Sequence, residues 1–143
     1  MPELIDSWAA GATYEDFMGR WSRLLAPRFV SWLSVRPAAN WLDVGCGTGA
    51  LADAICAGAE PASVVACDPS EPFIEYARRR QDSPRASFVV AGVDKLPTRP
   101  GGFDSVTSLL ALNFFPKPEA AINEMRRITA FNGLVSACVW DYA

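Results

Sequence analysis

The sequence predicts an α/β fold in which an open, mainly parallel sheet carries helices on both faces. Short apolar runs alternate with segments of helix length, and this alternation is typical of parallel strands joined by helices. Three glycines follow one of these apolar runs directly, where a strand would turn into a helix. No repeat or low-complexity tract is visible in the 143 residues. We therefore expect one domain, with an N-terminal arm and cap helices in residues 1–35 and the sheet in residues 40–143.

Composition argues against several classes of function. The net charge is −3 and the basic clusters are short, which disfavours a nucleic-acid partner. The chain has no histidine, and its four cysteines show no Cys-x-x-Cys spacing, so we expect neither a metal site nor a disulfide framework. We see no signal peptide and no apolar run of the roughly 18 residues that a membrane span needs. We therefore expect a cytoplasmic protein with no membrane partner.

The N-terminal segments precede the sheet. Residues 1–13 show no clear periodicity, and we expect a loosely held arm. From Tyr14 onward, apolar residues recur every three or four positions, which predicts an amphipathic cap helix. Pro27 should end or kink this helix, and residues 28–35 should form a second helical piece. The aromatic stripe of the cap helix either packs into the core or forms a lid over the glycines.

The first half of the core is predicted from apolar runs and from the residues that bound them. The second of these runs is rich in β-branched residues and lies between a proline and an aspartate, as expected of a buried strand. In chain order we predict a strand at Trp41–Val44, a helix at Gly49–Cys56, a strand at Ser63–Cys67, a helix at Glu71–Arg80 and a strand at Ala86–Ala91.

The second half of the core begins after a loop rich in glycine and proline. A strand is predicted at Phe103–Leu109. A helix should run from Pro118 to about Thr129, because proline suits a first helical position. Asn132-Gly133 then favours a turn, and Leu134–Trp140 is predicted as the last strand. Ligands of such sheets bind beyond the carboxyl ends of the strands, where we expect the site.

The glycine loop, Gly45–Gly49, is the first candidate site. Gly45, Gly47 and Gly49 can adopt the backbone angles of a sharp turn, and their missing Cβ atoms let a ligand lie on the backbone. The helix that follows has unpaired N–H groups that favour an anionic or polar ligand. Asp43 interrupts the preceding apolar strand, where a buried carboxylate needs a partner. The alternative is an ordinary strand–turn–helix corner.

Asp68 is the second candidate. It lies 19 residues beyond Gly49, at the end of the next strand, where a carboxylate can accept both hydroxyls of a ribose. The alternative is a helix-capping turn formed with Pro69 and Ser70. Its position relative to the glycine loop favours the ribose interpretation.

Taken together, these residues resemble class I S-adenosylmethionine-dependent methyltransferases, in particular their type 11 small-molecule branch. The resemblance runs from about Tyr14 to the end of the chain. It implies a Rossmann-like fold, with S-adenosylmethionine as the cofactor and S-adenosylhomocysteine (SAH) as its product. The motifs that carry it are, in order, Leu42-Asp43-Val44-Gly45-Cys46-Gly47-Thr48-Gly49, the strand-end acids Asp43 and Asp68, Leu96-Pro97 before Phe103-Asp104, and Glu124-Met125-Arg126-Arg127 before Asn132-Gly133-Leu134.

The resemblance implies a set of cofactor contacts. The backbone of the glycine loop, with Cys46 in it, would embrace the methionyl and ribose portions. Asp43 would bind the amino end or order the loop, and Asp68 would take the ribose hydroxyls. The other implied contacts are Pro69 and Phe73 beside the adenine, and Ser108 and Leu109 beneath the transferring methyl group.

One position departs from the family pattern. The family usually has an acidic residue four positions before the Leu-Pro pair, where it holds the adenine amino group. The residue that follows presents its backbone N–H to the ring. Here Gly92 takes the acidic position and Val93 follows it. Asp94, two positions further on, is the candidate substitute.

The cap segment, residues 14–23, also resembles that of the type 11 branch. Tyr14 and Arg23 are the residues we expect to reach the cofactor carboxylate, since an ionised partner suits a guanidinium group. No residue is assigned a catalytic role, because the sulfonium charge already activates the methyl group and the protein mainly has to position the reactants.

The implied function is transfer of a methyl group to a small-molecule acceptor. Two alternatives stay open: a truncated or non-catalytic module that binds S-adenosylmethionine, and a nicotinamide-dependent oxidoreductase. The Gly-x-Gly-x-Gly spacing disfavours the oxidoreductase. The family fold continues past its fifth strand, so the chain looks truncated after that strand. Residues 134–140 would then be an exposed edge through which two copies could form a homodimer.

Overall fold

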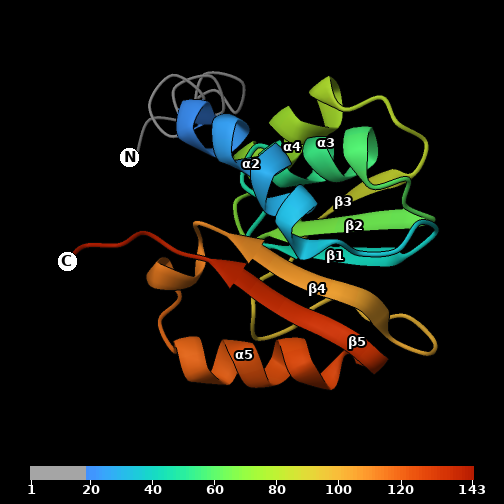
Figure 1. Ribbon diagram of the computed structural model, residues 1–143. Helices are drawn as coiled ribbons and strands as arrows, with labels where there is room; N and C mark the ends of the chain where they lie inside the picture. The colour runs from blue at the N-terminus through green and yellow to red at the C-terminus, as the bar shows by residue number, and fades with distance from the viewer. Residues whose placement is uncertain (1–18) are drawn as a thin grey trace.

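The computed structural model describes residues 19–143, in which five parallel strands form a single sheet (Figure 1). The strand order is β3-β2-β1-β4-β5, so that β1 lies at the centre. This confirms the predicted parallel α/β sheet. The predicted N-terminal arm, Tyr14 and the start of the cap helix lie outside the described residues. The strands are β1 (Asn40–Val44), β2 (Ser63–Asp68), β3 (Ala86–Val90), β4 (Phe103–Leu109) and β5 (Thr129–Cys138).

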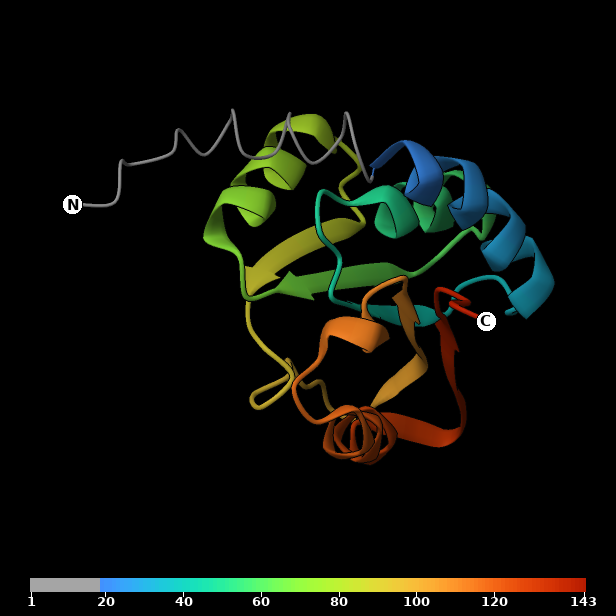
Figure 2. The same cartoon turned by 90° about the vertical axis from the view of Figure 1, so that its left-hand side faces the viewer.

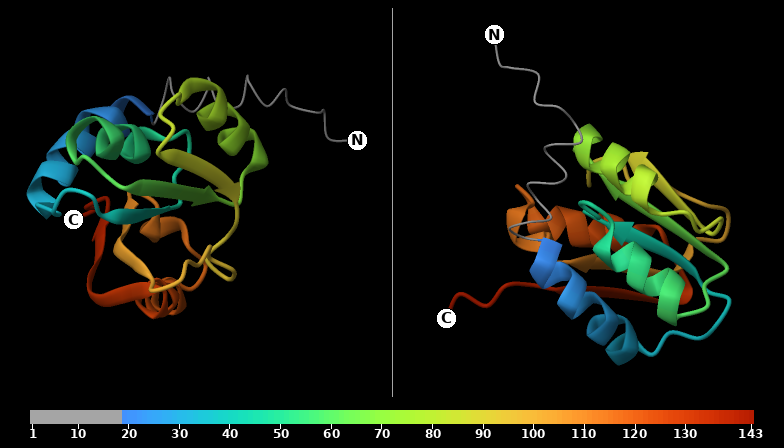
Figure 3. Two further views of the ribbon diagram at one scale, coloured as in Figure 1. Left: turned by 90° about the vertical axis from the view of Figure 1, so that its right-hand side faces the viewer. Right: turned by 90° about the horizontal axis from the view of Figure 1, so that it is seen from above.

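Helices cover both faces of the sheet, as the sequence predicts (Figures 1 and 3). One layer contains α2 (Arg20–Leu33), α3 (Ala50–Gly58) and α4 (Glu71–Arg80). The opposite layer contains α5 (Pro118–Arg127), which follows the short 3₁₀ helix η2 (Leu112–Phe114). Because every pair of neighbouring strands is parallel, the carboxyl ends of all five strands lie at the same end of the sheet.

Alternate residues of the central strand pack into two separate apolar layers. Trp41 points to the side of α2, α3 and α4, where it packs with Ile55 and Ile74. Leu42 points to the other side and packs with Val106 and Met125. The period of two along β1 therefore supplies side chains to both layers, and both sides of the strand are buried.

The prediction of two helical pieces around Pro27 is wrong. Helix α2 runs without interruption from Arg20 to Leu33 with Pro27 inside it. A proline in a helix interior costs about 3 kcal/mol. On either side of the exposed Pro27, the buried side chains of Ala26, Phe29 and Val30 hold α2 on the core. Packing therefore outweighs the local preference.

The last strand begins earlier than the sequence predicts. Strand β5 starts at Thr129, which pairs with Phe103, whereas Leu134 pairs with Ser105. The extra residues on β5 form an irregularity in which Asn132 takes a φ of 61°. Asn132-Gly133 therefore bends the chain inside a strand and does not precede it. Strand β5 lies at one end of the described sheet, as expected of an edge strand.

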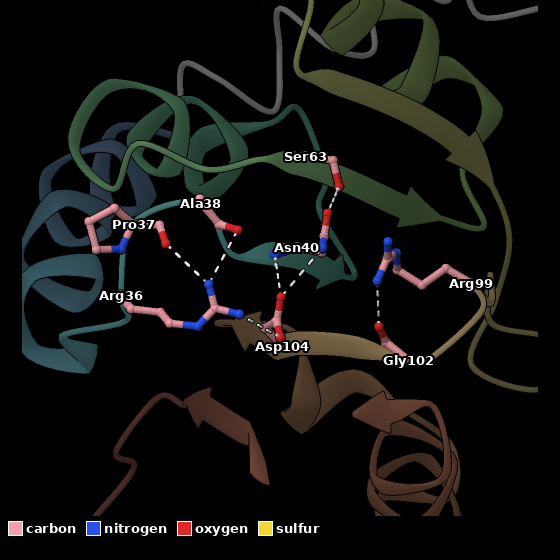
Figure 4. Close-up of polar contacts among 8 residues, drawn as sticks. All are labelled: Arg36, Pro37, Ala38, Asn40, Ser63, Arg99, Gly102 and Asp104. Atoms are coloured by element: carbon pink, nitrogen blue, oxygen red, sulfur yellow. Dashed lines mark hydrogen bonds and ion pairs between the residues drawn. The ribbon is translucent and has the colours of Figure 1, made fainter. Parts of the chain in front are cut away.

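At the amino ends of the strands, polar side chains satisfy one another (Figure 4). One carboxylate oxygen of Asp104 accepts a hydrogen bond from the backbone N–H of Asn40 at 2.8 Å, and the other accepts one from Arg36 at 3.1 Å. The Ser63 hydroxyl donates to the Asn40 side-chain oxygen at 2.7 Å. This network joins the starts of β1, β2 and β4, and we call it the Asp104 network.

Candidate functional site

The glycine loop connects the carboxyl end of β1 to α3. Gly45, Gly47 and Gly49 have φ values of 73°, 53° and 98°, which other residues adopt only with strain. The backbone N–H groups of Gly45 and Cys46 both donate to the Cys67 carbonyl oxygen at 2.9 Å. A Cβ on Gly45 would lie 2.7 Å from the Ala111 Cβ. The loop is thus held on the end of β2, with no room for a side chain at Gly45.

Asp68 joins this loop to the next one. It is the last residue of β2, and its two carboxylate oxygens accept hydrogen bonds from the backbone N–H groups of Gly47 (3.0 Å) and Ser70 (2.9 Å). Burial raises the pKa of Asp68, while these two hydrogen bonds lower it. A carboxylate has about four lone-pair sites. Asp68 can therefore hold the loop and still accept hydrogen bonds from a ligand.

Asp43 is a buried carboxylate in the middle of the sheet. It is 1% exposed, and neither oxygen accepts a well-formed hydrogen bond from any residue in the range 19–143, although the backbone N–H of Ala52 lies near enough to act on its pKa. Burial, followed by the negative charge of Asp68, raises the pKa of Asp43 to about 8, while the backbone N–H of Ala52 has the opposite effect. A cavity of about 10 Å³ lies between Asp43, Ser22 and Thr48. An acid in these surroundings favours a cationic or hydrogen-bond-donating partner.

A much larger cavity, of about 700 Å³, lies at the carboxyl ends of the strands. It shares Ser22, Gly45 and Leu109 with the small cavity beside Asp43. Its volume is in the usual range for small-molecule sites. Figure 2 shows the molecule from the side on which the carboxyl ends of the strands lie. The cavity is lined by nine of the residues predicted from sequence: Gly45, Gly47, Asp68, Pro69, Phe73, Gly92, Val93, Asp94 and Leu109.

The loop after β3 has an unusual carboxylate position. The Asp94 Oδ1 atom lies 2.8 Å from the point where a Cβ on Gly92 would be. The Lys95 backbone N–H donates to the Gly92 carbonyl oxygen at 3.2 Å and closes this turn. Asp94 therefore brings a carboxylate into the space where a side chain at position 92 would begin.

Other predicted residues lie away from the large cavity. The Arg23 guanidinium forms an ion pair with Asp53 at 2.6 Å, which ties α2 to α3. Ser108 is fully buried, and its hydroxyl has no hydrogen-bond partner within residues 19–143. Gly49 lines neither cavity. Cys46 lines the small cavity, and burial raises the pKa of its thiol.

Sequence reasoning missed one complete wall of the large cavity. This wall follows β4 and comes from η2, the loop after it and α5. Two features of the sequence could have indicated this wall. It follows the end of β4, and ligand sites form beyond the carboxyl ends of strands. Two adjacent phenylalanines also lie in the segment after that strand. The missed residues are Ser22 from α2 and Leu110, Ala111, Phe114, Phe115, Pro116, Lys117, Ala120, Ala121 and Glu124 from the second wall.

Comparisons with known proteins agree with this architecture. A family model described as a methyltransferase domain matches residues 42–137. The chain is 28% identical to a malonyl-[acyl-carrier protein] O-methyltransferase of Hahella chejuensis, over 88% of this chain and 45% of that protein. It is 34% identical to a demethylmenaquinone methyltransferase of Beutenbergia cavernae, over 71% of this chain and 40% of that protein.

Solved structures share the fold. The plantazolicin methyltransferase BpumL, solved in complex with SAH, matches with a TM-score of 0.71 and 20% identity, over 87% of this chain and 49% of that one. The chain spans less than half the length of the curated relatives described above. Within residues 19–143, no helix is both long and apolar enough to cross a membrane.

Proposed function

The chain belongs to the class I S-adenosylmethionine-dependent methyltransferase family of type 11, and on that premise we propose that it transfers a methyl group from S-adenosylmethionine to a small-molecule acceptor. The main support is Asp68, a strand-end carboxylate that fixes the glycine loop and also lines the 700 Å³ cavity. Its remaining lone pairs would accept the two ribose hydroxyls. Pro69 and Phe73, which line the same cavity, would lie beside the adenine.

Asp94 would take over the role of the acidic residue that is missing at position 92. Its carboxylate oxygen lies 2.8 Å from the ideal Cβ position of Gly92, so the negative charge is close to where the family pattern has it. A carboxylate there can accept a hydrogen bond from the adenine amino group. The Val93 backbone would meet the ring edge.

Asp43 would interact with the amino end of the cofactor. Its buried oxygens have no hydrogen-bond partner among residues 19–143, and the small cavity beside them adjoins the large one through Gly45 and Leu109. An ammonium group nearby would favour the ionised form of Asp43. The backbone of Gly45, Cys46 and Gly47 would lie against the methionyl portion, and Tyr14 remains the proposed contact of its carboxylate.

The protein's catalytic task would be to position the reactants. When bound, the sulfonium group supplies a methyl that is already activated by positive charge. Phe115 packs on Gly45, with ring atoms 3.4 Å from the ideal Cβ position. It can therefore restrict how an acceptor approaches the loop. Holding reactants in line can lower a barrier by roughly 7 to 11 kcal/mol. We assign no general base.

The test is a thermal melt with S-adenosylmethionine, SAH and NAD in parallel. A ligand at 100 times its dissociation constant stabilises the folded state by about 2.7 kcal/mol, which raises the melting temperature by roughly 8 °C in a domain of this size. We expect this shift with the two adenosyl ligands and its loss in Asp68→Ala. The exposed Asp82→Ala is the matched control. A shift with NAD alone would instead support the oxidoreductase, and binding without turnover would support the non-catalytic module.

We also propose that β5 pairs with a second copy of the chain. Strand β5 lies at an end of the described sheet, and residues 129–140 contain no charged residue and no proline that would protect an edge. Phe131 on this strand is 95% exposed. Light scattering should therefore show a dimer that Phe131→Lys dissociates and that Trp32→Lys, on the exposed side of α2, does not. A monomer at all concentrations would contradict the proposal.

The proposed compartment is the cytoplasm, where thiols stay reduced. All four cysteines are free, and burial raises the pKa of the Cys46, Cys67 and Cys138 thiols. Fractionation of cells that express the natural protein would test this assignment. Recovery from membranes or from the medium would contradict it.

A further inference from the structure

The large cavity has two walls, and the proposed cofactor contacts use mainly one of them. Those contacts come from the glycine loop and from the ends of β2 and β3, including Asp68 and Asp94. The second wall comes from η2, from Lys117 just before α5 and from one side of α5 itself, where Ala121 and Glu124 are three residues apart. This second wall is available to another ligand.

The second wall is mostly apolar. Ring atoms of Phe115 lie 3.4 Å from the point where a Cβ on Gly45 would be, so the wall begins directly beside the glycine loop. Phe114 lines the same cavity but is 65% exposed. Ala120 and Ala121 of α5 also line the cavity, and their side chains are short. These residues fit a ligand with an apolar, aromatic body, because the Phe114 ring can then be covered.

Two charged side chains lie on this wall, and their surroundings differ. Glu124 forms an ion pair with Arg127 at 2.8 Å, and this partner lowers the pKa of Glu124. Lys117 lines the cavity with an exposed side chain, and this side chain has no hydrogen bond or ion pair to any residue within 19–143. Glu124 is therefore neutralised by a neighbour, whereas the side chain of Lys117 is unpaired at the cavity and can pair with an anion there.

We propose that the second wall binds an acceptor with an aromatic body and an anionic group, with Lys117 pairing the anion and Phe114 covering the rings. The role of this ligand as methyl acceptor rests on the proposed function, but its binding does not. The apolar contacts supply affinity and the lysine supplies preference for acidic molecules over neutral ones.

The test uses two fluorescent probes with the same rings. Anilinonaphthalene sulfonate carries an anionic group, and phenylnaphthylamine lacks it. Lys117→Met should weaken binding of the sulfonate about fivefold, as expected for a partly exposed ion pair, and leave the neutral probe unchanged. Lys117→Glu should weaken sulfonate binding further. Lys95→Met, at an exposed lysine outside the cavity lining, is the matched control and should change neither probe.

A second pair of variants tests the apolar contact. Phe114→Ser should weaken both probes, whereas Phe131→Ser, at the 95% exposed phenylalanine of β5, should weaken neither. The proposal is overturned if Lys117→Met prefers the sulfonate probe over the neutral probe as strongly as the wild type does. It is also overturned if Phe131→Ser loses probe binding and Phe114→Ser does not. Probe binding without an SAH-dependent melting shift would leave this site intact and refute the proposed function. An SAH-dependent melting shift without probe binding would refute the second-wall site and leave the proposed function standing.

Discussion

Asp43 and Asp104 lie on neighbouring central strands of one sheet, but their surroundings are opposite. Asp104, at the amino end of β4, accepts hydrogen bonds from Asn40 and Arg36. Asp43, near the carboxyl end of β1, accepts no well-formed hydrogen bond among residues 19–143 and has only the backbone N–H of Ala52 to offset its burial. The protein therefore satisfies the carboxylate at one end of its sheet and leaves the other unsatisfied beside a cavity. A buried acid without partners costs free energy, so its presence at the ligand end indicates a role in binding.

Among the substitutions at the amino end of the sheet, we expect Gly102→Ala to lower the free energy of unfolding the most. A Cβ on Gly102 would lie 2.6 Å from the Ala130 backbone nitrogen, whereas one on Gly101 meets nothing within 4 Å. Both have φ near 80°. Gly102→Ala should lower the free energy of unfolding by about 3 kcal/mol and Gly101→Ala by about 1 kcal/mol. Both substitutions strain the backbone, but only the Cβ at position 102 clashes with a neighbouring strand. Denaturant unfolding measures both, and equal losses would contradict the packing.

Breaking the Asp104 network should have the next largest effect. In Asp104→Asn an amide N–H₂ group faces donors from Asn40 and Arg36, so one of these contacts becomes unsatisfied. We expect a loss of about 2 kcal/mol in the free energy of unfolding. Asp82→Asn, at an exposed position, is the control and should cost less than about 0.5 kcal/mol. Similar values for both variants would show that the network adds no stability.

Asp43 should make stability depend on pH. Its pKa is raised to about 8 in the folded chain, so the folded state holds more protons than the unfolded state between about pH 4 and pH 8. Stability from this group is complete below pH 4 and is lost as the pH rises toward 8, by at most about 1.4 kcal/mol per pH unit. Asp68, whose pKa is also raised, contributes in the same direction. Unfolding of the wild type and of Asp43→Asn across this range should show a shallower slope in the variant. If the wild type and Asp43→Asn show equal slopes of stability against pH, Asp43 is not the source of the pH dependence.

Arg36 should have the smallest effect. Its side chain is 64% exposed, and its ion pair with Asp104 at 3.1 Å is open to solvent. Arg36→Ala should therefore cost about 0.5 kcal/mol, well below Asp104→Asn. Denaturant unfolding at low and high salt checks this, because a screened surface pair should lose most of its effect in high salt. A loss as large as that of Asp104→Asn would mean that Arg36 is the essential partner of the network.

The sequence predicted the elements whose signals are local. The strand at Phe103–Leu109 and the helix at Glu71–Arg80 agree with the structure to the residue, because apolar runs and helix spacing are read directly. Pro27 misled the prediction, since the packing of α2 on α3 is a tertiary effect that outweighs a local rule. Strand β5 started early because pairing with β4 extends it through Asn132-Gly133.

The candidate site likewise has one part that the sequence predicted and one part that it did not. Its first wall was predicted because glycines and strand-end acids have a recognisable spacing. Its second wall was missed because Phe114 and Lys117 reach the cavity only through the course of the chain after β4, which no local pattern records. Arg23 was predicted as a ligand contact from the resemblance of the cap segment and from its charge, and in the structure its guanidinium also pairs with Asp53, 30 positions away, a contact that the sequence does not reveal.

The most direct test compares Asp43→Asn with Asp104→Asn in two measurements, the dissociation constant for SAH by calorimetry and the free energy of unfolding. We expect Asp43→Asn to weaken SAH binding about tenfold, because a charge-assisted hydrogen bond is lost, without lowering stability near neutral pH. Asp104→Asn should lower stability by about 2 kcal/mol and leave SAH affinity unchanged. Unchanged affinity in Asp43→Asn, or weakened affinity in Asp104→Asn, would contradict the division between a binding end and a structural end of the sheet.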